Sequence, residues 1–576
     1  MIQTTIEKSK LIFHIVEGTH ADEETFDFLL CLPEKTFYRR SRTFHAHLSV
    51  ANASYILGEC PFSLPADIRL RLAGLVKDFV RPVDVVAHSD EYQFPAEPFR
   101  HQAIAFNHAM SSQVWALFME MGTGKTKVAI DVADCRMERE EILFHFIVCP
   151  ATVIDVWYDQ YMEFSWLPNS PDLGDCWEPT VLIGSAKDRK RLLWRDETGP
   201  VFIINYEGLI VLQHELETFF NKFRGRFQLT LDESSAVKNM QAQRTKIMHR
   251  LAHLAKNRLI LTGTPMTQNY LDLFGQFYFL DPNILGYETF TAFKARYAIY
   301  GGKDNHIVVG WSHLAELKKR VRAYSYTVRK EDCLDLPPKT YQVLKLDMGK
   351  EQRQIYNDMR DKFIVEIEEM GKITKATVNT VLTKMLRLQQ ITSGHIKDDE
   401  GNIKTFDSVK MKTLPGIIGD IVGYGSKAVI QCIFRHEITA IVKLLNDKGF
   451  KAVALDGSVP IKDRGKLIRQ FHEDEELKVV VAQISLASLG IDLTPANYMI
   501  RFTHSYSLQD TLQFEDRVHR VGQGKNVTYI DLVCRGTTDV SVQNTLQRKF
   551  QMADFIMRQG TRGFTRFVKG EIDGEE

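Results

Sequence analysis

Two parts of the chain alternate short apolar runs with amphipathic segments. In the first part a polar turn follows each apolar run, and the runs lie at 114–119, 227–231 and 258–261. From about residue 427 the pattern restarts, with apolar runs at 427–434, 451–455 and 477–484. Strands that alternate with helical segments predict parallel sheets with crossover helices. The expected fold class is therefore α/β, with two parallel-sheet lobes in tandem.

The polar turn after the first run has the composition of a phosphate-binding loop. The sequence EMGTGKT spans 120–126, and the next segment, 127–137, has the apolar face of a helix. Such a loop needs glycines for close approach, a lysine for the outer phosphates and a hydroxyl for magnesium. Met119 replaces the usual first glycine, but the close approach falls further along the loop. The residues expected to hold the nucleotide here are Gly122, Thr123, Gly124, Lys125 and Thr126.

Two carboxylates follow the second apolar run. Asp232 and Glu233 come directly after the expected strand, at the edge of a parallel sheet where ligands bind. We expect Asp232 to hold magnesium and Glu233 to polarise the attacking water. Such a pair alone is usually a solvated turn, and the upstream phosphate loop is what favours catalysis. Thr262 and Thr264, in the turn after the third run, are expected to couple the two phosphate-facing loops.

The second part has no phosphate loop, so its contribution to catalysis has to come from across a cleft. The segment QFEDRVHRVGQ, at 513–523, predicts that Gln513, Arg517 and Arg520 share about one helical face. Two arginines presented to a triphosphate would act as an arginine-finger pair, because guanidinium groups suit the charge of a transferring phosphoryl group. Alone, the segment would favour a surface helix held in salt bridges. Its place after the other motifs favours catalysis.

Composition restricts the class of protein. Of the 576 residues, 44% are apolar and 25% are charged, and the formal net charge is zero. This length suggests roughly three or four domains. No apolar run is long enough to span a membrane, and eight scattered cysteines without zinc spacing suit a reducing compartment. We expect a soluble intracellular protein that gathers basic charge locally wherever it binds phosphates.

The ordered motifs resemble those of the Swi/Snf remodeller-like family of superfamily-two helicase-type DNA translocases. The resemblance covers about 96–550, and the matching segments include PFRHQ, EMGTGKT, DESSAVKN, LTGTPMTQN, SLGIDLTPANYMI and QFEDRVHRVGQ. It implies two RecA-like lobes and a DNA-dependent ATPase that uses ATP and Mg²⁺. It also implies that Gln102 reads adenine, that Gln513 helps to bind the nucleotide, and that Thr126 and Asp232 hold the metal. The residues expected to act in catalysis are Lys125, Glu233, Arg517 and Arg520.

Three positions bear on how closely the chain follows this family. Motif II reads Asp-Glu-Ser-Ser, where many relatives carry histidine in the fourth position. Because that residue couples the ATP state to the DNA-side loops, the coupling is expected to differ here. Asp492 stands where asparagine is common, and Met119 is non-glycine, as it also is in relatives.

The resemblance also implies a DNA surface. Relatives mostly track along duplex DNA without separating its strands, and they grip the backbone rather than read bases. The sequence contains no zinc finger, basic zipper or homeodomain pattern. We therefore expect sequence-independent binding of duplex or forked DNA by a monomeric motor, and a protein partner stays open. The expected contacts are Thr152, Asn205, Lys238, Arg329, Lys330 and Thr494.

The first 95 residues form a separate small module. The stretch EKTFYRRSRTFHAHLSV predicts two short strands around Arg39, Arg40 and Arg42, followed by a helix. It resembles the substrate-recognition modules that precede fork-remodelling, strand-annealing members of the family. Basic and aromatic side chains interleave there, as a binder of single strands or junctions requires. The alternative is a small α+β packing domain.

These observations give five segments. They are an accessory module at 1–95, a first lobe at 96–340, a helical protrusion and linker at 341–426, a second lobe at 427–545, and a helical brace with an acidic tail at 546–576. The leading hypothesis is an ATP-driven motor that translocates on double-stranded DNA, remodelling forks or recombination intermediates or displacing bound proteins. The alternatives are a strand-separating helicase, the motor subunit of a defence or restriction complex, and a nucleotide-gated scaffold with little turnover. The compact size suggests a bacterial or viral protein, acting in a bacterium or an infected host cell.

Overall fold

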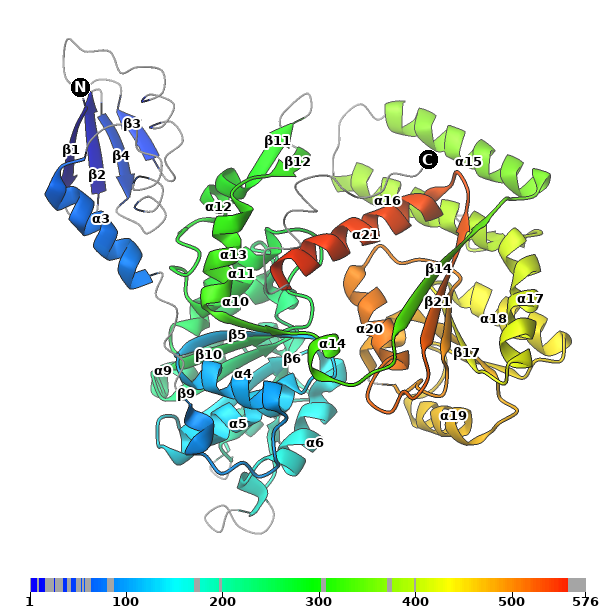
Figure 1. Cartoon of the computed structure of the whole chain (residues 1–576), viewed down its shortest axis with the longest axis horizontal. Helices are drawn as coiled ribbons and strands as arrows, with labels where there is room; N and C mark the ends of the chain where they lie inside the picture. Colours follow the sequence, from blue (N-terminus) through cyan, green and yellow to red (C-terminus); the bar gives the residue numbers. More distant parts are fainter. Residues whose placement is uncertain are drawn as a thin grey trace. The chain divides into compact units, whose positions relative to one another are not determined.

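A computed structural model shows the chain as two compact units, Met1–Arg329 with Ala553–Glu576, and Lys330–Met552 (Figure 1). The residues that it describes are 2–7, 10–15, 25, 29, 35–38, 43–47, 53, 56, 64–79, 87–169, 177–195, 199–301, 307–369, 375–397, 400–489 and 491–557. Among these, no helix combines the length and the apolar character needed to cross a bilayer. Each unit is considered by itself.

The N-terminal module is a four-stranded antiparallel sheet with one long helix (Figure 1). The strands, in sheet order, are β1 (Ile2–Glu7), β2 (Lys10–Ile15), β4 (Thr43–His47) and β3 (Lys35–Tyr38), and the helix is α3 (Ala66–Phe79). Buried apolar side chains of β2, β4 and α3, among them Phe13, Phe44 and Leu72, form its core. The expected pair of short strands is present as β3 and β4. Arg39, Arg40 and Arg42 lie between these strands, outside the described residues.

The first unit contains a seven-stranded parallel sheet. Its strands, in sheet order, are β13 (Ser325–Val328), β5 (Val114–Met119), β10 (Asn257–Leu261), β9 (Phe227–Asp232), β6 (Phe144–Cys149), β8 (Val201–Asn205) and β7 (Thr180–Val181). Every residue of β5 and β6 is buried, as expected for apolar runs in the centre of a parallel sheet. The three strands expected in this part are all present, as β5, β9 and β10.

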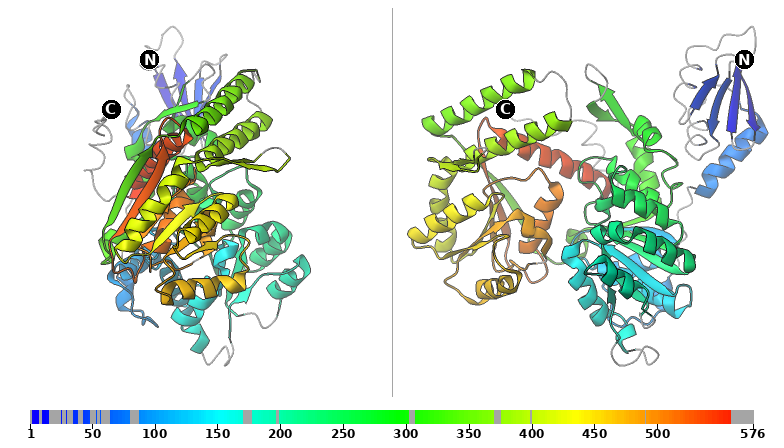
Figure 2. Two further views of the ribbon diagram at one scale, coloured as in Figure 1. Left: turned by 90° about the vertical axis from the view of Figure 1, so that its right-hand side faces the viewer. Right: turned by 180° about the vertical axis from the view of Figure 1, so that it is seen from behind.

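Helices cover both faces of this sheet (Figures 1 and 2). They form two sets whose members contact one another. One set is α4 (Arg100–Met110), α5 (Lys125–Glu138) and α6 (Ile154–Phe164); the other is α8 (Tyr206–Val211), α9 (Gln213–Lys222), α10 (Gln243–Ala252) and α11 (Asp272–Leu280). The remaining elements of this unit are α7 (Ala186–Leu193), α12 (Phe290–Tyr297), the hairpin β11 (Ala298–Gly301) and β12 (Ile307–Trp311), and α13 (Leu314–Ala323).

The second unit contains a six-stranded parallel sheet. Its strands, in sheet order, are β14 (Lys339–Leu346), β21 (Val527–Cys534), β20 (Tyr498–Arg501), β17 (Ala428–Cys432), β19 (Val479–Gln483) and β18 (Ala452–Leu455). The helices of this unit are α14 (Lys330–Cys333), α15 (Lys350–Glu369), α16 (Lys375–Ser393), α17 (Val409–Gly423), α18 (Arg435–Asp447), α19 (Ile461–Glu473), α20 (Leu508–Val518) and α21 (Thr538–Met557), and a hairpin joins β15 (His395–Lys397) to β16 (Ile403–Thr405). Neighbouring residues of β17, Val429 and Ile430, enter two different apolar clusters, which is the alternation expected of a strand buried on both faces.

Strand β14 differs from the expectation for this region. The sequence predicts a first lobe that ends at 340 and a helical linker after it. In the structure the second unit begins at Lys330, and β14 pairs with β21. Most of β14 is exposed because it is an edge strand. Its residues therefore mix polar and apolar types, and they lack the continuous apolar run by which the central strands were recognised.

Candidate functional site

The expected phosphate loop connects β5 to α5 in a conformation that requires glycine. Gly122 and Gly124 have φ angles of 78° and 87°, and Gly124 is the N-cap residue of α5. A Cβ atom on Gly124 would lie 2.0 Å from Nε2 of Gln102. The backbone N–H groups at the start of α5 are thus at a helix N-terminus, where anions bind. The loop therefore fits the phosphate groups of a nucleotide.

Two side chains of α4 bind the phosphate loop through the carbonyl oxygen of Thr123. Nε2 of Gln102 donates to the carbonyl oxygen of Thr123 at 3.2 Å, and Nε2 of His101 lies 2.8 Å from the same oxygen. Oε1 of Gln102 accepts the N–H of Phe99 at 3.0 Å. Both ends of this amide therefore have protein partners, so that Gln102 supports the loop, and its role toward adenine stays a prediction. His101 was not found from the sequence, since no motif spacing distinguishes it.

The side chain of Lys125, the first residue of α5, binds the backbone of the phosphate loop that precedes it. Its ammonium donates to the carbonyl oxygens of Met119 at 2.8 Å and Glu120 at 3.1 Å. Burial raises the pKa of Asp232, while the Trp157 N–H, the charge of Lys125 and a backbone N–H all favour its ionised form. Lys125 and Asp232 are thus close enough to interact electrostatically, although 107 positions separate them in the sequence. The structure brings the phosphate loop and the acidic motif to one site.

Asp232 is the last residue of β9, at the carboxyl edge of the sheet. Its Oδ2 accepts the indole N–H of Trp157 at 2.8 Å, and its Oδ1 accepts the N–H of Glu233 at 2.9 Å. The hydroxyl of Tyr206 donates to its carbonyl oxygen at 2.7 Å. The sequence does not predict Trp157 or Tyr206 as site residues. Each lies in a helical segment, where a buried aromatic side chain is as typical of a core as of a site.

A magnesium ion with a nucleotide fits these oxygen donors. Asp232 and Thr126 offer a carboxylate and a hydroxyl, which are ligands that Mg²⁺ prefers. Within the described ranges there is no group of three His, Cys, Asp or Glu side chains able to hold a metal alone. Mg²⁺ itself usually takes one or two protein ligands, with phosphates and water in its other positions.

Glu233 adopts a backbone conformation that is rare for a residue with a side chain. Its φ is 48° and its ψ is 54°, in the left-handed region. Strain of this kind costs on the order of 1–3 kcal/mol and gathers at functional sites. Its Oε2 accepts a hydrogen bond of 3.2 Å from the hydroxyl of Thr262. The backbone conformation therefore sets the direction of the Glu233 side chain, and Thr262, in the turn after β10, binds its carboxylate.

The turn after β10 contacts both of the other motifs. Thr262 Oγ1 accepts the N–H of Thr264 at 3.1 Å while it donates to Glu233. A Cβ atom on Gly263 would lie 3.3 Å from the carbonyl oxygen of Met119 and 3.3 Å from the N–H nitrogen of Met121. The turn therefore contacts both loops, through the hydrogen bond of Thr262 to Glu233 and through Gly263 beside the phosphate loop, and the coupling role of Thr262 and Thr264 stays a prediction.

The arginine motif of the second unit differs from the expected helical face. Gln513 and Arg517 lie on α20, but the helix ends at Val518, so Arg520 follows it in a turn. Past the end of the helix, Nε2 of Gln523 donates to the carbonyl oxygens of Val518, Ala496 and Thr494, and so joins this turn to the loop before β20. Gln513 is buried and Arg517 half-buried. In the part of the chain that the structure describes, the half-buried Arg520 guanidinium has no hydrogen-bond or ion-pair partner.

The expected DNA contacts have varied environments. Thr152 is exposed, and Arg329 is half-buried. Asn205 pairs with Arg189 and Glu207, Lys238 donates to Thr267, and Thr494 donates to Asp492.

Lys330 differs from the other expected DNA contacts. It is 4% exposed, and its ammonium donates to Asp516 at 2.5 Å and to the carbonyl oxygen of His519 at 3.0 Å. The structure thus does not present Lys330 to a DNA phosphate. It gives this lysine a role inside the second unit, because a buried ammonium requires a charged partner.

Comparisons with known proteins agree with this arrangement of motifs. A family model for the SNF2-related domain matches residues 100–395, which is more than half of the chain. The chain belongs to the SNF2 family. A model for the helicase conserved C-terminal domain matches residues 409–522. Residues 100–522 thus contain an SNF2-family ATPase core, with the α/β fold of two parallel sheets that the sequence predicts.

Individual relatives are distant. One relative is the SWI/SNF-related matrix-associated actin-dependent regulator of chromatin subfamily A containing DEAD/H box 1 of Xenopus tropicalis. The two sequences are 25% identical over 488 residues, and the match covers 75% of this chain and 47% of that protein. The chain is 26% identical to the TATA-binding protein-associated factor MOT1 of Saccharomyces cerevisiae, over 77% of this chain and 26% of MOT1. The chain thus spans half or less of the length of these relatives. Among solved structures, the Sulfolobus solfataricus SWI2/SNF2 ATPase core in complex with dsDNA has 22% identity and a TM-score of 0.38, over 84% of this chain and 96% of that one.

Proposed function

We propose that the chain is an ATP-driven motor that translocates on double-stranded DNA and remodels DNA structures or displaces bound proteins. The observation that carries this proposal is the convergence of Lys125, Asp232 and Glu233 on one glycine cradle at the carboxyl edge of the first sheet. ATP hydrolysis stimulated by DNA is typical of the SNF2 family. Magnesium dependence, a monomeric state and a bacterial or viral setting belong to the same proposal.

The residues of the first unit have separate roles in hydrolysis. The N–H groups of the loop and the Lys125 ammonium bind the phosphates, once the lysine leaves the two loop carbonyls that it contacts. Thr126 and Asp232 would hold the metal, which would supply positive charge to the phosphate groups. Glu233 orients the attacking water and accepts its proton, and the hydrogen bond from Thr262 fixes the direction of the carboxylate.

The second unit supplies positive charge. Arg520 has no polar partner among the described residues, and Arg517 lies two residues before it, at the end of α20. A guanidinium that reaches the γ-phosphate stabilises the charge that develops during phosphoryl transfer. We assign this role to Arg517 and Arg520.

The proposed substrate is duplex or forked DNA, bound without sequence preference. Thr152, Asn205, Lys238, Arg329 and Thr494 are the proposed backbone contacts, which suits a motor that grips phosphates. The N-terminal module, with Arg39, Arg40 and Arg42, is proposed to select forked DNA.

One set of measurements tests this function. ATP hydrolysis by the full chain is measured at 100 mM salt with single-stranded DNA, duplex, forked DNA and RNA, because DNA affinity depends strongly on salt. Displacement of a third strand from a triplex reports translocation, and separation of a labelled duplex reports helicase activity. We expect stimulation by duplex and fork and displacement of the third strand, both absent in the Glu233→Gln variant. Hydrolysis that DNA does not change would contradict the proposal, and duplex separation would favour the helicase alternative.

A further inference from the structure

The segment 502–507 of the second unit, which joins β20 to α20, is held through its backbone by four buried or half-buried side chains. Each donates to a different carbonyl oxygen of the segment. The pairs are Lys410 to Phe502 at 2.8 Å, Gln431 to Thr503 at 3.3 Å, Gln389 to His504 at 2.9 Å and Lys549 to Tyr506 at 2.8 Å. The donors come from α17, β17, α16 and α21. Four elements of the unit thus determine the path of six residues.

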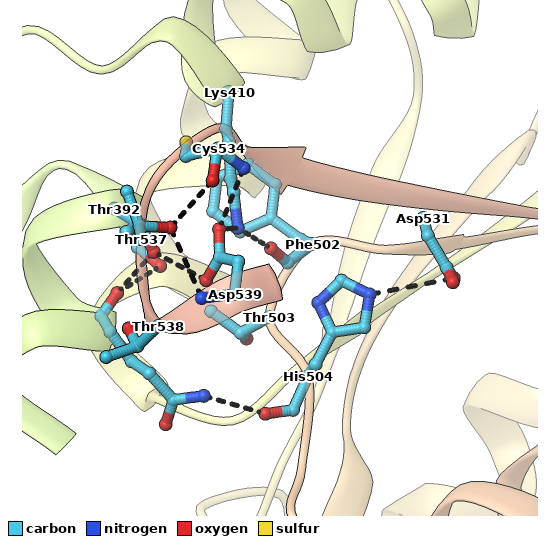
Figure 3. Close-up of polar contacts among 12 residues, drawn as sticks. Thr392, Lys410, Phe502, Thr503, His504, Asp531, Cys534, Thr537, Thr538 and Asp539 are labelled. Atoms are coloured by element: carbon cyan, nitrogen blue, oxygen red, sulfur yellow. Dashed lines mark hydrogen bonds and ion pairs between the residues drawn. The ribbon is translucent and has the colours of Figure 1, made fainter. Parts of the chain in front are cut away.

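Lys410 is the buried charge among these donors. Its side chain is 0% exposed, and its ammonium lies 2.8 Å from Oδ2 of Asp539 as well as 2.8 Å from the Phe502 oxygen. Burial alone would lower the pKa of Lys410, but the Asp539 carboxylate more than offsets this effect and the pKa is raised. The side chain is therefore a cation fixed between a carboxylate and the backbone of the segment, as Figure 3 shows.

Both carboxylate oxygens of Asp539 have polar partners. Its Oδ1 accepts the hydroxyl of Thr392 at 3.1 Å, and its Oδ2 accepts the N–H of Cys534 at 3.1 Å in addition to Lys410 (Figure 3). A buried ion pair contributes little net stability relative to apolar residues of the same volume. It does impose a single geometry, because each charge needs all of its partners. The pair is thus better explained by the position that it gives to segment 502–507 than by stability.

The segment leads directly into the arginine motif. Ser507 is the N-cap residue of α20, and its hydroxyl oxygen accepts the N–H of Asp510 at 3.2 Å. The helix then runs to Val518 and carries Arg517 in its last turn, with Arg520 two residues beyond its end. A helix is stiff, so a shift at its first turn moves its last turn as well. Small errors in the position of a catalytic group cost large factors in rate.

We propose that Lys410, through its pair with Asp539, is a positioning residue for ATP hydrolysis. It holds segment 502–507, and so α20, where Arg517 and Arg520 can act on the transferring phosphoryl group. Lys410 itself touches no reacting atom. The inference rests on the proposed function, because it deepens the role given to the two arginines.

The test compares two buried lysines of the same unit. Lys410→Met removes the donor to the segment. Lys427→Met is the matched control: Lys427 is 6% exposed and donates to the carbonyl oxygens of Phe471 at 2.7 Å and Asp474 at 2.9 Å, away from 502–507. Both changes are expected to lower the melting temperature. Only Lys410→Met is expected to lower kcat, by about tenfold or more, with the KM for ATP within about twofold of wild type.

A second variant keeps the proposal testable if Lys410→Met does not fold. Gln389→Met removes the donor to His504 without leaving a buried charge unpaired. It is expected to lower kcat by about threefold to tenfold at unchanged KM. If kcat stays at the wild-type value in Gln389→Met, and in Lys410→Met where that variant folds, the segment does not position the arginines and the proposal is overturned.

A double-mutant cycle distinguishes positioning from general damage. In an Arg517→Ala, Arg520→Ala background, Gln389→Met and Lys410→Met should lower kcat by no more than about twofold, because both groups that they position are gone. Effects that multiply in the double variants would overturn the proposal. Failure of the proposed function looks different: the wild-type chain would then show no DNA-stimulated hydrolysis. Normal hydrolysis that depends on Arg520 but not on Gln389 or Lys410 would contradict this inference alone.

Discussion

The hydroxyl of Thr262 donates a hydrogen bond of 3.2 Å to Oε2 of Glu233, across neighbouring parallel strands of the first sheet. The same hydroxyl oxygen accepts the N–H of Thr264. The contact joins the carboxylate of a residue with a left-handed backbone to the motif that follows the neighbouring strand. The direction of the proposed catalytic base is therefore set by a residue 29 positions away in the sequence.

Thr262→Val tests this contact. The change keeps the shape of the side chain and removes the donor, so we expect kcat to fall by about tenfold, a loss of about 1.4 kcal/mol of transition-state stabilisation, with little change in the KM for ATP. Steady-state ATP hydrolysis at saturating duplex DNA measures both. Thr245→Val is the control, since Thr245 is also buried and its hydroxyl has no hydrogen-bond partner within the described residues. Equal turnover in both variants would remove the role of Thr262.

Glu233→Gln tests the base itself. The amide keeps a hydrogen-bond acceptor for Thr262 but cannot take a proton, so we expect ATP binding to persist and turnover to fall by about 10²-fold or more. Binding of a fluorescent ATP analogue and single-turnover hydrolysis separate the two effects. Glu140 has a similar φ, 56°, and is exposed, so Glu140→Gln controls for removing a carboxylate from a left-handed position. A Glu233→Gln enzyme that loses ATP affinity yet keeps its turnover number would show that the assignment is wrong.

Gly124→Ala tests the loop that holds the phosphates. The new methyl group would lie 2.0 Å from Gln102 Nε2 at a φ of 87°, so either the loop or Gln102 has to move. We expect ATP affinity to fall by about tenfold or more, in line with a displaced set of backbone donors. Gly425→Ala has a φ of 71° with nothing within 4 Å, so it carries the backbone strain without the contact. Unchanged ATP affinity in Gly124→Ala would contradict the cradle proposed here.

His395 predicts an acid sensitivity of the second unit. It is 3% exposed, and burial, with the neighbouring His436, lowers its pKa to about 4. In the unfolded chain His395 binds a proton near pH 6.5, whereas in the folded chain it binds one only near pH 4. The free energy of unfolding therefore falls as the pH drops through this window, by up to about 3 kcal/mol, and is regained above pH 6.5.

His395→Phe should reduce this slope by the share of one histidine, because phenylalanine does not titrate and can keep the edge contact with Phe434. Urea unfolding of the full chain between pH 4.5 and pH 7.5, with hydrogen exchange of the 395–405 hairpin, measures it. His253→Gln is the control, since His253 is exposed. A slope that is the same in His395→Phe and wild type would assign the acid sensitivity to other groups, such as the buried His145.

The sequence by itself determined the central strands and the chemistry that follows them. β5 is a continuous apolar run, as is typical of a strand buried in a parallel sheet, while β9 and β17 mix apolar residues with polar ones such as Gln228, Thr230 and Gln431. Gly124 and Lys125 could be recognised because phosphate binding needs particular residues at fixed short spacings. Thr262 was expected near the other two motifs because the carboxyl ends of parallel strands share one edge, but its contact with Glu233 depends on the pairing of β10 with β9.

Only the tertiary structure decided which distant residues complete these local features. Trp157 and Tyr206 meet Asp232, Lys330 is buried against Asp516, and Gln523 joins the end of α20 to the carbonyl oxygens of Thr494 and Ala496. None of these contacts leaves a period or a spacing in the sequence, because each depends on how separate elements pack. A charged or aromatic side chain has the same local pattern at a surface, in a core or at a site. Its burial and its partners, which the fold alone supplies, decide among the three.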